Sequence, residues 1–173
     1  MKKSLFTCIN FRIAFIVFLY ISNATALSAQ EGTGRTNKLG GHFGVVHPLV
    51  IFSGGKTATI ADSYNVGFPT GVTLKTSDKF AFDIEFVPFI NEGNRVNLLF
   101  HPGALFPLGR NFTFGTRAAF EINQGAYGFT PLLNKAFPMK NNTVVFTELV
   151  LPVRFDGFGN TATIIALHVG IGF

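Results

Sequence analysis

Few side chains in this sequence could carry nucleophilic chemistry. Beyond residue 30 the serines are Ser53, Ser63 and Ser77, and there is no Gly-x-Ser-x-Gly motif. A catalytic serine needs an activating base beside it, and His47 is the histidine nearest in sequence to Ser53 and Ser63. We therefore predict a protein that is not an enzyme. An acyl hydrolase or transferase acting on lipid through a loop serine is the alternative.

Phosphate-binding and metal-binding motifs are incomplete. The run from Ser53 to Thr57 (Ser-Gly-Gly-Lys-Thr) is similar to the end of a phosphate-binding loop, but Val50 stands where the first glycine belongs. The four histidines are too dispersed for metal-ligand spacing. We predict no metal and no cofactor. The histidines are His42, His47, His101 and His168.

The composition is unusual for a soluble domain. Charged residues make up 13% of the 173-residue chain, against roughly 25% in typical soluble proteins, and 47% of the residues are apolar. The basic residues are scattered rather than clustered, which argues against nucleic-acid binding. A water-soluble domain of this size needs a charged surface, and this chain has too few charges to form one. We therefore expect part of its surface to contact an environment other than water.

Two-residue periodicity runs through the chain beyond residue 38. Between Thr163 and Phe173, large apolar residues and threonine alternate with smaller or polar ones, and residues 80–87 and 112–123 behave alike. Beyond residue 29 no apolar stretch approaches the roughly 20 residues of a spanning helix. Membrane insertion would then require a closed barrel, because open strand edges are not tolerated in lipid. We predict an all-β fold, an eight-stranded antiparallel up-and-down transmembrane β-barrel.

Turn signals set the expected strands. The longest connections are expected at Ser53–Asp62 and Ala136–Asn142, and an even strand number places both chain ends on one side. Prolines fall inside six of the strands and predict bulges or strand ends towards one rim. The expected strands are 40–52, 63–74, 80–90, 96–106, 112–123, 127–135, 143–154 and 162–173, and the prolines are Pro48, Pro69, Pro88, Pro102, Pro131 and Pro152.

The alternation assigns a set of charged residues to the barrel interior. Unpaired buried charges are costly, so these residues are expected to form one hydrogen-bonded network. Gly115, Gly170 and Gly172 are expected to make room for the arginines. The network predicts a structural plug that holds the barrel shut; a proton or ion path is the alternative. Its expected members are Asp83, Glu85, Arg117, Glu121, Glu148, Arg154 and His168, with His42 and His101 as further candidates.

The N-terminus has the organisation of a secretory signal peptide over residues 1–29. Lys2 and Lys3 form the charged start, and a short apolar core follows at 13–21. Cleavage is expected after Ala26 or after Ala29, which would remove the single cysteine, Cys8. Residues 30–38 are then expected to form a flexible periplasmic lead-in, and residues 39–173 the barrel domain.

Together, the leader, the alternating strands and the aromatic C-terminus resemble the small bacterial outer-membrane barrels of the OmpA/OmpX kind. The resemblance implies export to the outer membrane, contact with its lipid, and a porin-like barrel with a structural, minor transport or interaction role. It also implies that the barrel assembly machinery reads the last strand, here Leu167, Val169, Ile171 and Phe173. The sequence sets no oligomeric state. The alternative is a soluble, lipocalin-like barrel that binds a small apolar ligand, in which the apolar side chains would face inward.

Overall fold

The structure, a computed structural model, describes residues 38–91, 93, 95–140 and 142–173. The predicted signal peptide, Cys8 and most of the predicted lead-in lie outside these residues. Among the described residues, no helix is long and apolar enough to cross a membrane. The strands are β1 (Lys38–Ser53), β2 (Lys56–Thr59), β3 (Asn65–Gly67), β4 (Thr70–Lys75), β5 (Ala81–Asn91), β6 (Val96–Gly109), β7 (Phe112–Glu121), β8 (Tyr127–Pro138), β9 (Val144–Val150), β10 (Val153–Phe155) and β11 (Thr161–Gly172).

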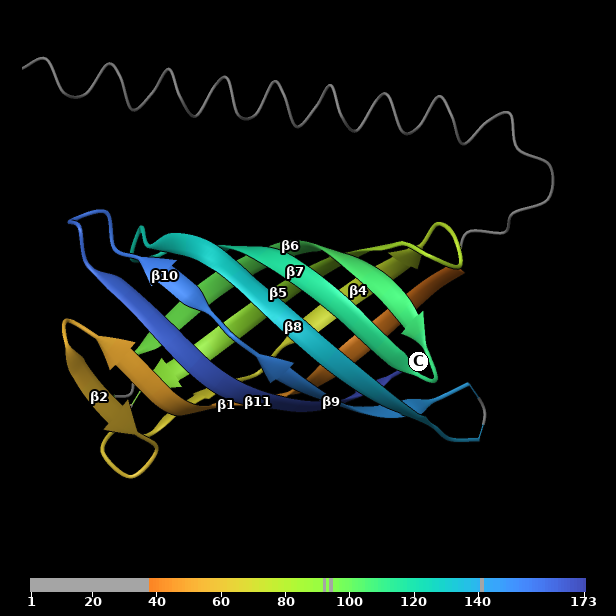
Figure 1. The fold of residues 1–173 in the computed structure, drawn as a ribbon, viewed down its shortest axis with the longest axis horizontal. Coiled ribbons are helices and arrows are strands. Elements are labelled where there is room, and N and C mark those ends of the chain that lie inside the picture. The colour runs from red at the N-terminus through yellow and green to blue at the C-terminus, as the bar shows by residue number, and fades with distance from the viewer. Residues whose placement is uncertain (1–37, 92, 94, 141) are drawn as a thin grey trace, which may run out of the picture. The chain divides into compact units, whose positions relative to one another are not determined.

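The strands form one antiparallel sheet that closes on itself (Figure 1). The long strands pair in chain order from β5 to β9, β3 and β4 pair with β1 and β5, and β2 pairs with β1 alone. β1 also pairs with β11, from His42↔Gly172 to Ser53↔Ala162. β3 and β4 together occupy one position in the ring, as do β9 and β10, so the ring has eight positions. The predicted all-β antiparallel architecture is confirmed, and the chain forms a β-barrel.

The two interrupted positions are interrupted at prolines. Pro69 separates β3 from β4, and Pro152 separates β9 from β10. Proline lacks the N–H that a ladder needs, but its carbonyl still accepts: Pro69 O from Gly44 N–H, and Pro152 O from Ile164 N–H. A third irregularity shifts the β1–β11 register after Pro48. These breaks lie within the barrel wall, in the half away from the start of β1 and the end of β11, so the predicted side is correct although the breaks do not reach the rim itself.

Several predicted boundaries were wrong, among them the end of β6, which continues to Gly109 beyond the expected residue 106. The expected loop 53–62 contains a hairpin, in which Gly54 (φ 56°) and Gly55 (φ 71°) form the two-residue turn between β1 and β2. Consecutive residues with positive φ match the twist of a hairpin, and two glycines supply them. β8 continues to Pro138, into the second expected long loop, and Lys38 already belongs to β1.

The ring has two rims. The termini rim carries the start of β1, the end of β11 and the turns 76–80, 110–111 and 139–143. The loop rim carries the β1–β2 hairpin, the turns 60–64, 122–126 and 156–160, and the ends of β5 and β6 at Asn91 and Val96. At the loop rim, hydrogen bonds from Asn160 and from the Phe158 N–H lower the pKa of the Asp156 carboxyl, and those from Thr59 lower the pKa of Asp62.

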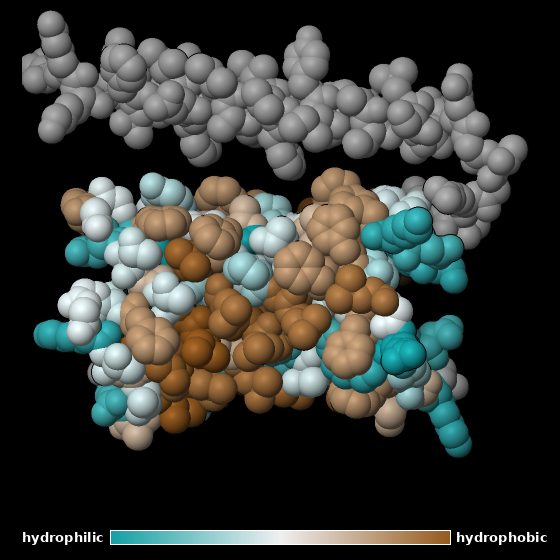
Figure 2. All heavy atoms as spheres, viewed as in Figure 1, coloured by the Kyte–Doolittle hydropathy of each residue, from teal (hydrophilic) through white to brown (hydrophobic). Residues whose placement is uncertain are grey.

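Side chains alternate between the lumen and the outer surface. Along β5, Ala81, Asp83, Glu85 and Val87 are buried inside the ring, whereas the residues between them are exposed. The same alternation runs along β7 and β11. Figure 2 shows the result on one face, where apolar side chains cover the middle of the barrel and hydrophilic side chains gather at the two ends.

Candidate functional site in the barrel lumen

Arg117 is the centre of a buried charge network. It projects from β7, and its Nε donates to Asp83 Oδ2 at 2.7 Å. Its Nη1 donates to Glu148 Oε2 at 3.3 Å, and its Nη2 lies 3.6 Å from Glu85 Oε2. All four side chains are almost completely buried. One guanidinium therefore holds carboxylates from β5 and β9, on both sides of the lumen.

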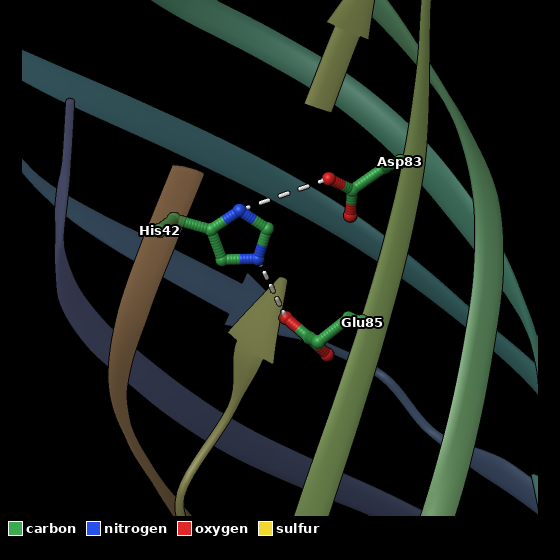
Figure 3. A group of neighbouring side chains, drawn as sticks. All are labelled: His42, Asp83 and Glu85. Carbon is green, nitrogen blue, oxygen red and sulfur yellow. Dashed lines mark hydrogen bonds and ion pairs between the residues drawn. The ribbon is translucent and has the colours of Figure 1, made fainter. Parts of the chain in front are cut away.

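His42 joins the network from β1 (Figure 3). Its imidazole lies between two carboxylates of β5, with Nδ1 3.8 Å from Asp83 Oδ1 and Nε2 3.3 Å from Glu85 Oε2. Residues two apart on a strand face the same side, so the two acids flank the ring. To reach β5 the ring crosses β4 at Gly71, where a Cβ would lie only 2.6 Å from His42 Cε1. Glycine is needed here for space.

These three side chains also form the group closest to a metal site. Ligand atoms of His42, Asp83 and Glu85 all lie within 4.8 Å of one another. However, the carboxylates approach different nitrogens of one ring, and both also interact with Arg117. Asp83 Oδ1 additionally accepts a hydrogen bond from Thr73 Oγ1 at 2.7 Å. The arrangement satisfies hydrogen bonds better than it would coordinate a single cation.

Towards the loop rim the network continues through His101 and Arg154. His101 Nδ1 lies 3.1 Å from Glu85 Oε1, and Arg154 Nη2 lies 3.2 Å from His101 Nε2. Because a guanidinium can only donate, His101 Nε2 must accept, and its Nδ1–H donates to Glu85. His101 is therefore neutral. Arg154 also donates to Thr130 Oγ1 and to the carbonyls of Phe129 and Val153.

Glu148 connects the network to β11 and β8. His168 Nδ1 lies 2.7 Å from Glu148 Oε2, and Asn134 Nδ2 donates to Glu148 Oε1 at 3.0 Å. His168 Nε2 is buried without a partner among the described residues. It faces Gly44, where a Cβ would lie 2.6 Å away. One ring nitrogen of His168 therefore joins the network, and the other lies against the backbone of β1.

The network divides the lumen into two cavities. The outer cavity, of about 190 Å³, extends from His101, Arg154 and His168 towards asparagines at the loop rim. The inner cavity, of about 290 Å³, extends from His42 and Asp83 towards the termini rim. Arg117 lines both cavities. The charged layer is therefore a partition across the barrel.

The walls of the outer cavity were not foreseen. The sequence predicted a small and polar interior, but this half of the lumen is largely apolar. Its core is a buried cluster of Leu132, Val150 and Ala166, on which further apolar side chains pack. The apolar side chains of Val87 and Leu99 stand at inward positions of their strands and could have indicated this wall.

The structure places the seven predicted interior residues as follows. Six are buried in the network, whereas Glu121 is half-buried at the wall of the outer cavity. The further candidates His42 and His101 are also in the network. Thr73, Thr130 and Asn134 were missed, although their inward register could have indicated them. The six buried residues are Asp83, Glu85, Arg117, Glu148, Arg154 and His168.

The prediction of which glycines make room for the arginines was wrong. A Cβ at Gly115 would meet Leu105, one at Gly170 would meet Phe146, and one at Gly172 would meet Val144. Arg117 instead passes Gly103 of β6, where a Cβ would lie 2.6 Å from Arg117 Cγ. The glycine that matters lies on the strand that the long side chain crosses, and this depends on register.

Among the described residues, neither Ser53 nor Ser63 forms a hydrogen bond with His47, so the catalytic pair of the acyl hydrolase or transferase alternative is not assembled. Ser63 Oγ accepts a hydrogen bond from Asn65 Nδ2, while His47 Nδ1 is buried without a partner. The His47 ring instead packs edge-on against Tyr64, with centroids 5.0 Å apart.

The last strand presents its predicted assembly residues outward. Leu167, Val169, Ile171 and Phe173 are exposed, and the residues between them are buried. Phe173 pairs with Gly41 through two backbone hydrogen bonds, so the terminal residue takes part in closing the ring.

Neither a protein-family model nor a curated protein matches this chain. Among solved structures, it is similar to a chain described as "De novo design of transmembrane beta-barrels". The two are 11% identical, with a TM-score of 0.42, over 79% of this chain and 98% of that one.

Replacing the central arginine should destabilise the barrel. Arg117→Met removes the cation that three buried carboxylates share, and breaking buried ion pairs in this way costs about 3–5 kcal/mol. Arg95→Met, at an exposed turn, is the matched control and should change stability by less than about 0.5 kcal/mol. Urea titration of the folded barrel measures both free energies of unfolding. Equal stability of the two variants would contradict a stabilising network.

Proposed function

We propose that this chain is an integral β-barrel of a bacterial outer membrane, closed by its interior charge network and without enzymatic activity. One observation carries the proposal: apolar side chains face outward around the ring while the buried charges lie in the lumen. Its role is then structural: a membrane-embedded scaffold that presents its rims on the two sides of the membrane.

The outer surface supports contact with lipid. Large apolar side chains are exposed along the long strands, far more than the isolated exposed apolar residues normal in soluble proteins. On the face that Figure 2 shows, apolar side chains cover most of the middle of the barrel. The exposed apolar residues around the ring include Phe43 and Val45 of β1, Val72 of β4, Phe82, Ile84 and Phe86 of β5, Phe114 and Phe120 of β7, Phe129 and Leu133 of β8, Leu149 of β9, and Leu167 and Val169 of β11.

Strand length supports the same proposal. β5 has 11 residues and β11 has 12. At about 3.3 Å per residue, 11 residues extend over about 36 Å. Membrane barrel strands tilt by about 35–45°, which reduces this to a height near the roughly 25 Å apolar band of such barrels.

The soluble lipocalin-like alternative requires the opposite arrangement. Such a barrel would bury its apolar residues around a ligand and expose its charges to water. Here Asp83, Glu85 and Arg117 are inside, and Phe82 and Ile84 are outside. The apolar outer cavity is the one feature shared with that alternative, but it leaves the exposed apolar belt unexplained.

The lumen supports a closed barrel rather than a pore. An eight-stranded barrel is just wide enough for side chains to fill it. The partition at Arg117 fills it with groups bonded from β5, β7 and β9.

Location and partners are part of the proposal. The predicted signal peptide supports export, and the outward row that ends at Phe173 supports recognition by the barrel assembly machinery. The apolar belt supports contact with outer-membrane lipid.

Cell fractionation and a heat-modifiability gel test the location. The protein should sediment with outer membranes, and unboiled samples should migrate differently from boiled ones, because the closed barrel resists detergent unfolding. A matched sample of a soluble periplasmic protein serves as the control. Recovery in the soluble periplasmic fraction would contradict the proposal.

A charge on the outer surface distinguishes lipid from water. Ile84→Arg introduces a cation into the outward row of β5, and in a bilayer this should destabilise the barrel by about 2–4 kcal/mol. In water, a surface substitution changes stability by less than about 0.5 kcal/mol. Phe158→Arg, at a loop-rim turn where Phe158 is 93% exposed, is the control. Unfolding in lipid vesicles should separate the two variants, and equal stability would contradict lipid contact at Ile84.

Electrical recording tests the closed lumen. The purified protein in planar bilayers should show no discrete current steps, because the paired side chains of the partition lie across the lumen between the two cavities. A porin recorded in the same bilayers confirms that channels can be detected. Regular unitary currents from the wild-type barrel would favour the ion-path alternative.

A further inference from the structure

Charges outside the lumen are distributed unequally between the two rims. The termini rim and the wall next to it carry six basic side chains and one acidic side chain, Asp78, among the described residues. We call the six the basic collar. Its members are Lys38, Lys75, Lys79, Arg110, Lys135 and Lys140.

The loop rim lacks this excess. Its basic residues, Lys56 and Arg95, are balanced by the acidic residues Asp62 and Asp156 within the described part of the chain. Since both rims are exposed, exposure alone does not explain the difference. The positive charge is a property of one end of the barrel.

The collar surrounds the barrel instead of forming one patch. Its members lie at the start of β1, at the end of β4, on β8 and in three separate turns. Backbone hydrogen bonds close two of these turns, from Thr76 N–H to Phe80 O and from Met139 N–H to Thr143 O. Lys75 also pairs with Asp78 at 3.0 Å, and this pair stays at the rim.

Lys135 places a cation of the collar among the outward apolar side chains of β8, between Leu133 and Phe137. It follows the outward-facing Leu133 on β8, yet its Nζ donates to Arg110 O in the rim turn at 2.7 Å. The ammonium lies 4.2 Å from the centre of the Phe112 ring. Lysines at membrane boundaries extend in this way, with the stem on apolar surface and the charge at the polar edge.

We propose that the basic collar binds the phosphate groups of anionic phospholipids in the leaflet around the termini rim. The inference rests on the proposed membrane location. Cations that encircle the barrel at the edge of an apolar belt match a ring of lipid headgroups, whereas a protein or nucleic-acid ligand would need a patch on one side. Exposed aromatic rings of Phe106, Phe112 and Phe137 lie near the collar, where acyl chains begin.

Lipid retention tests this inference. The full chain is expressed in a Gram-negative host, and the product is purified from membranes. It is reconstituted in equimolar phosphatidylcholine and phosphatidylglycerol with identical acyl chains, then extracted in mild detergent. Mass spectrometry gives the ratio of the two co-purified lipids. Wild type should enrich phosphatidylglycerol, and 1 M salt should reduce the enrichment, because it shortens the screening length to about 3 Å.

Two variants locate the effect. Each basic residue near an anionic surface favours binding by roughly fivefold. The triple variant Lys75→Gln, Lys79→Gln and Lys140→Gln should therefore lose most of the enrichment, on the order of tenfold or more if the contributions multiply. Lys56→Gln with Arg95→Gln, at the loop rim, is the control and should keep the enrichment.

The outcomes separate this inference from the proposed function. Heat-modifiable barrels that incorporate into vesicles but retain both lipids equally would overturn the inference alone. An equal loss of enrichment in the loop-rim control would also overturn it. Failure to incorporate into vesicles of either lipid would overturn the proposed membrane location, and this inference with it.

Discussion

Charges that leave water together must be paired, and in this barrel that requirement falls on one arginine. Arg117 is within reach of three carboxylates on two strands that are not its neighbours. The pairing holds β5, β7 and β9 around a common point. Where a long side chain crosses an intervening strand to reach its partner, that strand has a glycine, because a Cβ there would clash. The paired groups lie between the two cavities of the lumen, and Arg117 lines both of them.

The polar interior and the apolar exterior are two results of the same alternation. A strand with charges on one face and phenylalanine on the other cannot satisfy both faces in water or both in lipid. Closing the sheet gives each face its own environment, with the charges solvated by one another and the apolar row left for hydrocarbon. The polar lumen and the surrounding hydrocarbon both end at the rims. The charges of the termini rim and of the loop rim can therefore differ.

The sequence predicted much of the fold because alternation is a local property. The inward positions of Asp83, Glu85 and Arg117 follow directly from it. Contacts across strands depend on register, which no local pattern determines. For this reason Gly71 and Gly103 were missed as the crossing points for His42 and Arg117, and Gly115 was chosen wrongly. Pro69 and Pro152 are tolerated inside the wall because their carbonyl oxygens accept hydrogen bonds from other strands. These donors, on β1 and β11, lie elsewhere in the sequence, so the local pattern could not reveal them.

The pairing of β1 with β11 has a consequence for how the molecule forms. His42 and Gly172 are partners in the ladder although 130 positions separate them. Such a contact has a high loop-closure entropy and is expected late in folding. Until the last strand is in place, β1 presents an unpaired edge with an apolar row beside it, the combination that favours aggregation. The chain must therefore be kept from closing on itself or on its copies until its final residues are available.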